Sequence, residues 1–167
     1  MTLIVDAQVP SMFMQNGQVF TVTTGAQAGA SQTSGCCLFN ASASKNAYVF
    51  SIFVMNSDPG QGVYTSLRKV TANPSYSNAI TPVCTVLSSS NTSAMTATWQ
   101  ASASVTGTDI GTDNFNAGTN SKDLLLIGNI SGRGFLLGGG TNVGLSVFVG
   151  QGGTGGFWSV TYTYVEF

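Results

Sequence analysis

The clearest pattern in the chain is an alternation of apolar and polar residues near its C-terminal end. In residues 157–167, large apolar or aromatic side chains alternate with hydroxyl side chains: Trp158, Val160, Tyr162 and Tyr164 against Ser159, Thr161 and Thr163. Residues 143–149 show the same period, with valine or leucine at every second position. Because successive side chains of a β-strand point to opposite faces, both segments are predicted to be strands. Residues 47–55 are apolar on both faces, which predicts a strand covered on both sides.

Shorter apolar runs separated by turn residues predict further strands. These runs cover residues 18–24, 63–70, 83–87, 94–100, 124–130 and 134–137. Clusters of Gly, Pro, Asn and Ser lie between them, and no window shows a sustained helical periodicity. The sequence therefore predicts an all-β chain of about eight to ten short strands, arranged as an antiparallel sandwich or a barrel. Residues 106–122 show no strand pattern and are predicted to form a surface excursion.

One domain is expected, because 167 residues suffice for a single hydrophobic core. Residues 18–167 are predicted to form this β-sandwich domain. Residues 1–17 carry two apolar groups before the first clear strand, and they are predicted to form either an extended arm that seeks a partner or an edge strand. As an arm, they supply six candidate interaction residues: Leu3, Ile4, Val5, Met12, Phe13 and Met14.

The composition is poor in charge. Charged residues make up 7% of the chain, the formal net charge is −1, and Ser, Thr, Gly and Asn together account for 73 of 167 residues. The few scattered Lys and Arg residues give no electrostatic footprint for nucleic acid, and no apolar run approaches the roughly 20 residues that a membrane-spanning helix needs. No nucleic-acid or membrane partner is therefore expected, and residues 1–6 lack the pattern of a signal peptide.

Residues that could carry catalysis or bind a metal are scarce. General acid–base catalysis favours histidine or a tuned pair of carboxylates, and the chain has no histidine. The only close carboxylates, Asp109 and Asp113, lie in a glycine-rich segment, where a role in turns is expected more often than calcium binding. Residues 150–155 match the phosphate-binding pattern G-x-G-x-x-G, but the helix that this site requires is not predicted after them. A non-enzymatic protein without a cofactor or a metal is expected.

Three cysteines are present, so a complete set of internal disulfides is excluded. Cys36 and Cys37 are neighbours and would point to opposite faces of a strand, which makes a bridge between them unfavourable. Pairing of Cys84 with either of them is left open by the sequence. Buried thiols that pack as small hydrophobic groups are the expected state.

The aromatic side chains of the last predicted strand allow two interpretations. Trp158, Tyr162 and Tyr164 share one face, and a flat aromatic row can stack on sugar rings. The same alternation is typical of a strand whose face is buried in a core or in a subunit interface, and this second interpretation is favoured. The three residues remain candidate interaction residues.

The order of several segments resembles a known family. Leu38-Phe39-Asn40-Ala41-Ser42-Ala43-Ser44-Lys45-Asn46-Ala47-Tyr48-Val49 is followed by Leu67-Arg68-Lys69-Val70-Thr71, by Ala79-Ile80-Thr81-Pro82-Val83, and by a last strand, Val160-Thr161-Tyr162-Thr163-Tyr164-Val165-Glu166-Phe167. This order resembles the small jelly-roll-like β-sandwich proteins that decorate or cement the capsids of tailed bacteriophages. The resemblance covers most of residues 36–167, but not the segment 106–122, and implies an antiparallel, jelly-roll-like sandwich that is often assembled as a homotrimer.

The sequence and the resemblance are compatible with three functions. The resemblance implies a capsid decoration protein on the exterior of the virion, made in the host cytoplasm, with the major capsid protein as its partner. The alternative is a trimeric adhesin or receptor-binding head domain that binds a cell-surface glycan, and an enzyme is a distant third. A surface with few charges favours the first, because it loses less solvation when it is buried against neighbours.

Overall fold

The structure, a computed structural model, describes residues 18–28, 33–58, 63–86, 89–115, 118–123, 134–150 and 156–167. Its strands are β1 (Val19–Thr23), β2 (Gln27–Ala28), β3 (Ser34–Asn40), β4 (Ala47–Asp58), β5 (Val63–Val70), β6 (Asn78–Ile80), β7 (Val83–Cys84), β8 (Thr96–Gln100), β9 (Thr108–Phe115), β10 (Gly118–Asp123), β11 (Phe135–Leu137), β12 (Val143–Val149) and β13 (Phe157–Glu166). These described ranges hold no helix, and so none that could cross a membrane. The predicted all-β class is confirmed.

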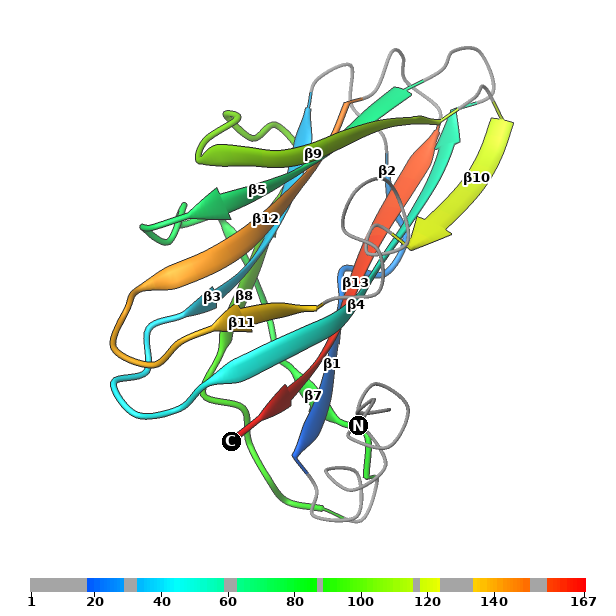
Figure 1. The fold of residues 1–167 in the computed structure, drawn as a ribbon. Coiled ribbons are helices and arrows are strands. Elements are labelled where there is room, and N and C mark those ends of the chain that lie inside the picture. The colour runs from blue at the N-terminus through cyan, green and yellow to red at the C-terminus, as the bar shows by residue number, and fades with distance from the viewer. Residues whose placement is uncertain are drawn as a thin grey trace, which may run out of the picture.

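The strands form two antiparallel sheets that pack as the two layers of a sandwich (Figure 1). Sheet A has seven strands in the order β10-β4-β13-β1-β7, with β11 also paired to β4 and β2 to β13. Sheet B has six strands in the order β6-β8-β3-β12-β5-β9. The predicted antiparallel sandwich is therefore confirmed, and the barrel alternative is excluded.

The pairing of strands is nested along the chain. The first strand pairs with the last, β1 with β13; going inward, β3 pairs with β12, β4 with β10 and β11, and β5 with β9. Successive pairs alternate between sheet A and sheet B, so the chain behaves as one long hairpin rolled into two layers. This is the arrangement of a jelly roll, which confirms the predicted jelly-roll-like topology.

The main core lies between the two sheets. Its largest side chains come from β13, where Trp158, Tyr162 and Tyr164 are fully buried. The Tyr162 hydroxyl donates to the Cys36 carbonyl oxygen at 2.8 Å and accepts from the Val147 amide at 3.2 Å, so it links sheet A to two strands of sheet B. A buried hydroxyl is satisfied in this way, and the alternation of residues 157–167 is explained by one face turned into the core.

A second, smaller cluster covers the outer face of sheet B. It consists of Cys37, Phe39, Val70, Tyr76, Ala103 and Phe148. Tyr76 comes from the connection between β5 and β6; its ring packs edge-on against Phe148, and its hydroxyl lies 3.2 Å from the Ser146 hydroxyl. Sheet B is thus covered on its outside by the chain's own connections.

Several predicted elements need correction. Residues 106–122 are not a surface excursion, because they contain β9 and most of β10. Thirteen strands are described rather than eight to ten, and the predicted strand 124–130 lies outside the described residues. β4 is not covered on both sides: Thr163 pairs with Ser51 and Tyr164 with Val49, so Phe50 is an extra residue in a bulge. The bulge brings Val49 onto the buried face with Ile52, whereas Phe53 points outward and is 41% exposed.

Candidate interaction surface

The candidate residues from the sequence fall into two groups. Leu3, Ile4, Val5, Met12, Phe13 and Met14 lie outside the described residues. Trp158, Tyr162 and Tyr164 belong to the main core, and none of their side chains reaches the surface of the chain. This face of β13 is therefore core within one chain, and it offers no platform on which a sugar could stack.

The outer face of sheet A carries no second hydrophobic cluster among the described residues, in contrast to the outer face of sheet B. Its residues are those that alternate with the core residues on β1, β4 and β13: Thr21, Thr23, Ser51, Phe53, Met55, Phe157, Ser159, Thr161 and Thr163. Of these, Ser159 is itself buried. Thr21 lies opposite Thr163 and Thr23 opposite Thr161, where the Thr161 hydroxyl donates to that of Thr23 at 3.0 Å. Two phenyl groups interrupt this hydroxyl array, Phe53 and Phe157, which are 41% and 37% exposed.

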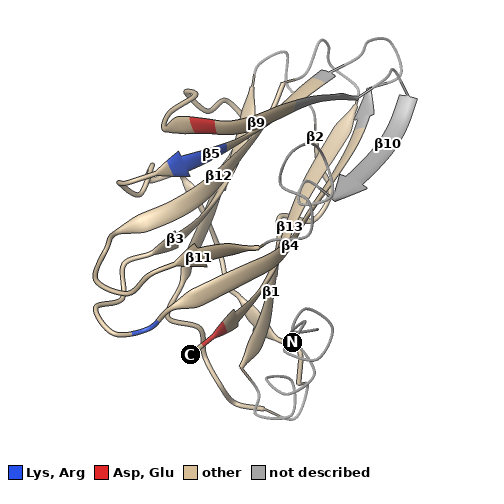
Figure 2. Cartoon of the chain, in the orientation of Figure 1, with Lys and Arg blue, Asp and Glu red and all other residues tan. Residues whose placement is uncertain are grey.

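None of these nine residues carries a charge. Figure 2 shows the described charged residues at other positions in the chain, with one group on β5 and β9 and another at the lower end of the sandwich. In the first group, Arg68 donates to Gly107 O at 3.1 Å and pairs with Asp109 at 3.4 Å. The second group contains Lys45, before β4, and Glu166 at the end of β13. If a partner covers these nine outward residues, hydroxyl groups and phenyl rings are removed from water, but no charged side chain among the nine is desolvated.

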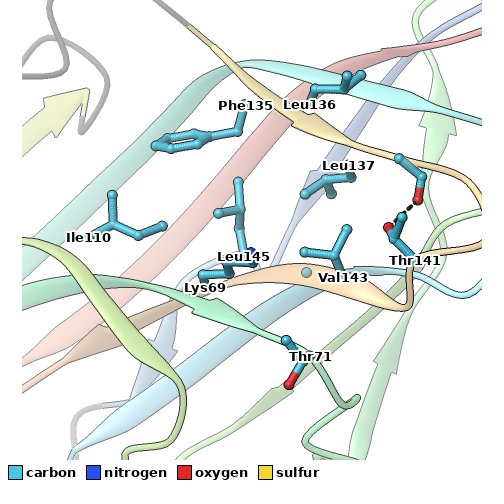
Figure 3. A pocket seen from close by; sticks show the side chains of 11 residues that line it. Lys69, Thr71, Ile110, Phe135, Leu136, Leu137, Thr141, Val143 and Leu145 are labelled. Atoms are coloured by element: carbon cyan, nitrogen blue, oxygen red, sulfur yellow. Dashed lines mark hydrogen bonds between the residues drawn. The ribbon is translucent and has the colours of Figure 1, made fainter.

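An apolar pocket of about 490 Å³ lies at one edge of the sandwich (Figure 3). Ile110 from β9, Phe135 and Leu137 from β11, and Val143 and Leu145 from β12 line it, so that both sheets contribute. Ile110 enters this group because β9 bulges there: Leu67 pairs with Gly111 and Arg68 with Asp109, which leaves Ile110 unpaired. The lining can hold an apolar group, with the Lys69 side chain as its one cationic member.

A second pocket, of about 430 Å³, has a polar lining at the lower end of the sandwich. Gln18, Lys45, Ser90, Asn91, Thr92 and Glu166 contribute polar groups to it, beside Phe20 and Ala94. Glu166 is buried, and its carboxylate accepts hydrogen bonds from the Ala94 amide and from the Ser93 hydroxyl, which also lies 2.7 Å from the Tyr164 hydroxyl. Glu166 therefore ties the connection before β8 to the last strand, and it also presents an anionic group to the pocket.

Within the described residues, the remaining sequence motifs assemble no reactive site. Asp109 serves the ion pair with Arg68, and the Asp113 side chain is outside the described residues. Of the glycine-rich stretch 150–155, only Gly150 is described, and its amide donates to the Tyr64 carbonyl oxygen. Across the described ranges, no three His, Cys, Asp or Glu side chains come close enough to hold a metal ion.

All three cysteines are buried and none of them is in a disulfide, so the pairing left open by the sequence does not form. Burial raises the pKa of the Cys37 thiol to about 12. Burial and, less strongly, the neighbouring Cys37 also raise the pKa of Cys36. Thiols with raised pKa values are poor nucleophiles, which agrees with a packing role.

We expect stability to fall as the pH rises above about 8.5, the usual pKa of a thiol in an unfolded chain. The unfolded chain then loses thiol protons that the folded chain keeps until about pH 12 at Cys37, so the folded state loses stability as the pH rises. Thermal melts at pH 7, 9, 10 and 11 would measure this, and the Cys37→Ala variant should show a shallower decline. An equal decline in both proteins would contradict the role of Cys37.

Two parts of this surface were not identified from sequence. Phe53 lies in a segment that is apolar on both faces, so its outward position has no sequence signal. The polar pocket joins residues 18–20, 45, 90–94 and 166, which share no motif. Phe157 had a detectable signal, because it falls out of step with the buried residues of β13. Comparison with protein-family models, with curated proteins and with solved structures finds no match to this chain.

Proposed function

We propose that this chain is a non-enzymatic structural protein of a bacteriophage virion, which attaches as a homotrimer to the outer surface of the capsid and stabilises the shell. Its partner would be the major capsid protein of the same virion, with assembly on the capsid exterior after synthesis in the host cytoplasm. The jelly-roll topology supports this class, since the fold recurs in viral capsid and lectin domains, although a fold alone does not determine function.

The observation that carries the proposal is the set of nine uncharged outward residues on β1, β4 and β13. A protein that holds a shell together needs a broad contact area rather than a deep pocket. This face offers hydroxyl groups across three neighbouring strands, with Phe53 and Phe157 as aromatic groups that a partner can cover. Aromatic side chains are enriched at the centres of interfaces, and charged ones are depleted there.

Attachment can be tested with capsids that lack the protein. The chain is added to such capsids, and the bound fraction is measured after sedimentation at a series of concentrations. We expect Phe53→Ser combined with Phe157→Ser to weaken binding by about tenfold or more, because two buried phenyl groups are worth several kcal/mol at an interface.

Val105→Ser is the matched control, since Val105 is 43% exposed on a connection of sheet B. Unchanged binding of the double variant, with its melting temperature preserved, would reject sheet A as the contact face. Failure of the unaltered chain to bind any such capsid would reject the function itself.

Deletion of residues 1–14 is also expected to weaken attachment while the sandwich stays folded, if the N-terminal segment clamps the shell.

The polar pocket favours a second candidate function, a trimeric adhesin or receptor-binding head that binds a glycan. Amide, hydroxyl, ammonium and carboxylate groups line a volume large enough for one or two sugar rings. A glycan panel would test it, with Lys45→Ala and Thr92→Ala as variants that spare the structural Glu166. Glycan binding that both variants reduce, without capsid binding, would replace the first proposal.

A further inference from the structure

The outer face of sheet A changes character toward the start of β1. Thr23 is exposed, Thr21 is half-buried, and Val19 is only 2% exposed, although all three point to the same side of the sheet. Their partners on β13 change in the same way, from Thr161 and Thr163 to Val165, which is 1% exposed. The outward row thus switches from threonine to valine where the surface becomes buried.

Val19 and Val165 lie opposite each other, and neither belongs to the two hydrophobic clusters that the described residues form. The main cluster takes the inward residues of the same strands, among them Phe20 and Tyr164. An apolar pair on an outward face requires an apolar cover, because exposed sheet positions favour threonine, as the neighbouring rows show.

We propose that Met12-Phe13-Met14 supplies this cover by folding back over Val19 and Val165. The described chain begins at Gln18, directly beside Val19, so the preceding residues start at the patch itself. Asn16-Gly17 is a dipeptide that favours tight chain reversal, and it separates Met14 from Val19 by the length of one turn. A covalently attached segment also has a high effective concentration at its site, which favours it over a separate partner.

This docking gives the two apolar groups of residues 1–17 different roles. Met12, Phe13 and Met14 anchor the segment on its own sandwich, while Leu3, Ile4 and Val5 lie beyond the anchor, where they can reach a neighbouring molecule. This docking is independent of attachment to a capsid and can be measured on the isolated chain.

Disulfide trapping tests the placement directly. In Phe13→Cys combined with Val165→Cys, the two residues would come within the roughly 7 Å that a disulfide allows between Cα atoms. We expect most molecules to form this bond within one chain under mild oxidation, with little interference from the three buried native thiols. The control, Phe13→Cys combined with Thr161→Cys, places the second cysteine two outward positions further along β13, and at least tenfold less bond is expected. A disulfide between two chains would show that a second copy covers Val19 and Val165. If no disulfide forms, the Met12-Phe13-Met14 segment is excluded as the cover. Either result overturns the proposal.

A double-mutant cycle tests the energetic coupling. Val165→Thr should lower the melting temperature of the full chain by several degrees, because the covered valine becomes polar. In a chain that lacks residues 1–14, the same substitution should change the melting temperature by less than about 1 °C, since the position is then open to water. An equal loss in both backgrounds would overturn the proposal even if the cysteine variants failed to fold.

Discussion

Replacing Asn40 by alanine is expected to lower the free energy of unfolding by about 3 kcal/mol, since each buried hydrogen bond contributes about 1 kcal/mol and its loss leaves a partner unsatisfied. Asn40 ends β3 and is fully buried. Its Nδ2 donates to the carbonyl oxygens of Lys45 at 2.8 Å and Leu137 at 2.9 Å, and its Oδ1 accepts from the Ser42 amide at 2.9 Å. One side chain therefore holds the β3–β4 connection against the end of β11. Chemical denaturation of the variant would measure the loss.

Two further substitutions sharpen this test. Asn73→Ala is the matched control, because Asn73 accepts a hydrogen bond from Ser75 in an exposed turn, and a loss below about 1 kcal/mol is expected there. Asn40→Asp keeps the acceptor for Ser42 but turns an anionic oxygen toward two carbonyls. Its loss should exceed that of alanine at pH 7 and shrink at pH 4, where protonation restores one donor. Equal losses for Asn40→Ala and Asn73→Ala would show that the bridge is not a structural anchor.

Residues 63–70 and 143–149 were predicted as strands and coincide with β5 and β12. The alternation in β12 is visible because large aliphatic residues face the main core, whereas Gly144 and Ser146 lie on the opposite face, although that face is also buried. In β3, where all seven residues are buried, apolar residues from Cys36 to Phe39 lie on both faces and no alternation results. β9 is an edge strand paired only with β5, and its described side chains are mostly exposed. Because backbone pairing rather than side-chain burial stabilises β9, residues 106–122 show no apolar alternation and were predicted to form a connection.

The candidate surface was less predictable, because it depends on which face of each sheet remains open. The alternation at Trp158, Tyr162 and Tyr164 is compatible with a core and with a surface platform, and only the packing of sheet B over sheet A decides between them. Phe53 points outward because it alternates with the buried Ile52 and Val54, but a strand that is apolar on both faces does not show which face is open. The bulge at Phe50 changes the facing of the residues before it and brings Val49 onto the buried face. Neither the packing of the layers nor the bulge has a local sequence signature. The contrast between a covered outer face on sheet B and an open one on sheet A is likewise a property of the whole topology.

Replacing Trp158 by alanine is expected to have the largest effect of any single substitution considered, a loss of about 4 kcal/mol, as is typical when a buried tryptophan is truncated. The indole is fully buried, and its ring packs edge-on against Trp99 with 5.8 Å between the ring centroids. Denaturant unfolding followed by circular dichroism would measure the loss without relying on the altered tryptophan signal. Because this residue was also a candidate for stacking on a sugar, the measurement separates core from platform: a platform residue could be removed with little loss of stability.

The neighbouring Phe157 provides the control, since it precedes Trp158 in the same strand but points to the outer face and is 37% exposed. Phe157→Ala should cost about 1–2 kcal/mol, well below the loss for Trp158→Ala, because the phenyl group keeps more than a third of its surface in water whereas the indole keeps none. A loss for Phe157→Ala as large as that for Trp158→Ala would mean that both faces of β13 are covered. In that case the outer face of sheet A would be part of a permanent interface rather than a free docking surface. A large difference between the two variants leaves Phe157 available for a partner, which the proposed attachment through sheet A requires.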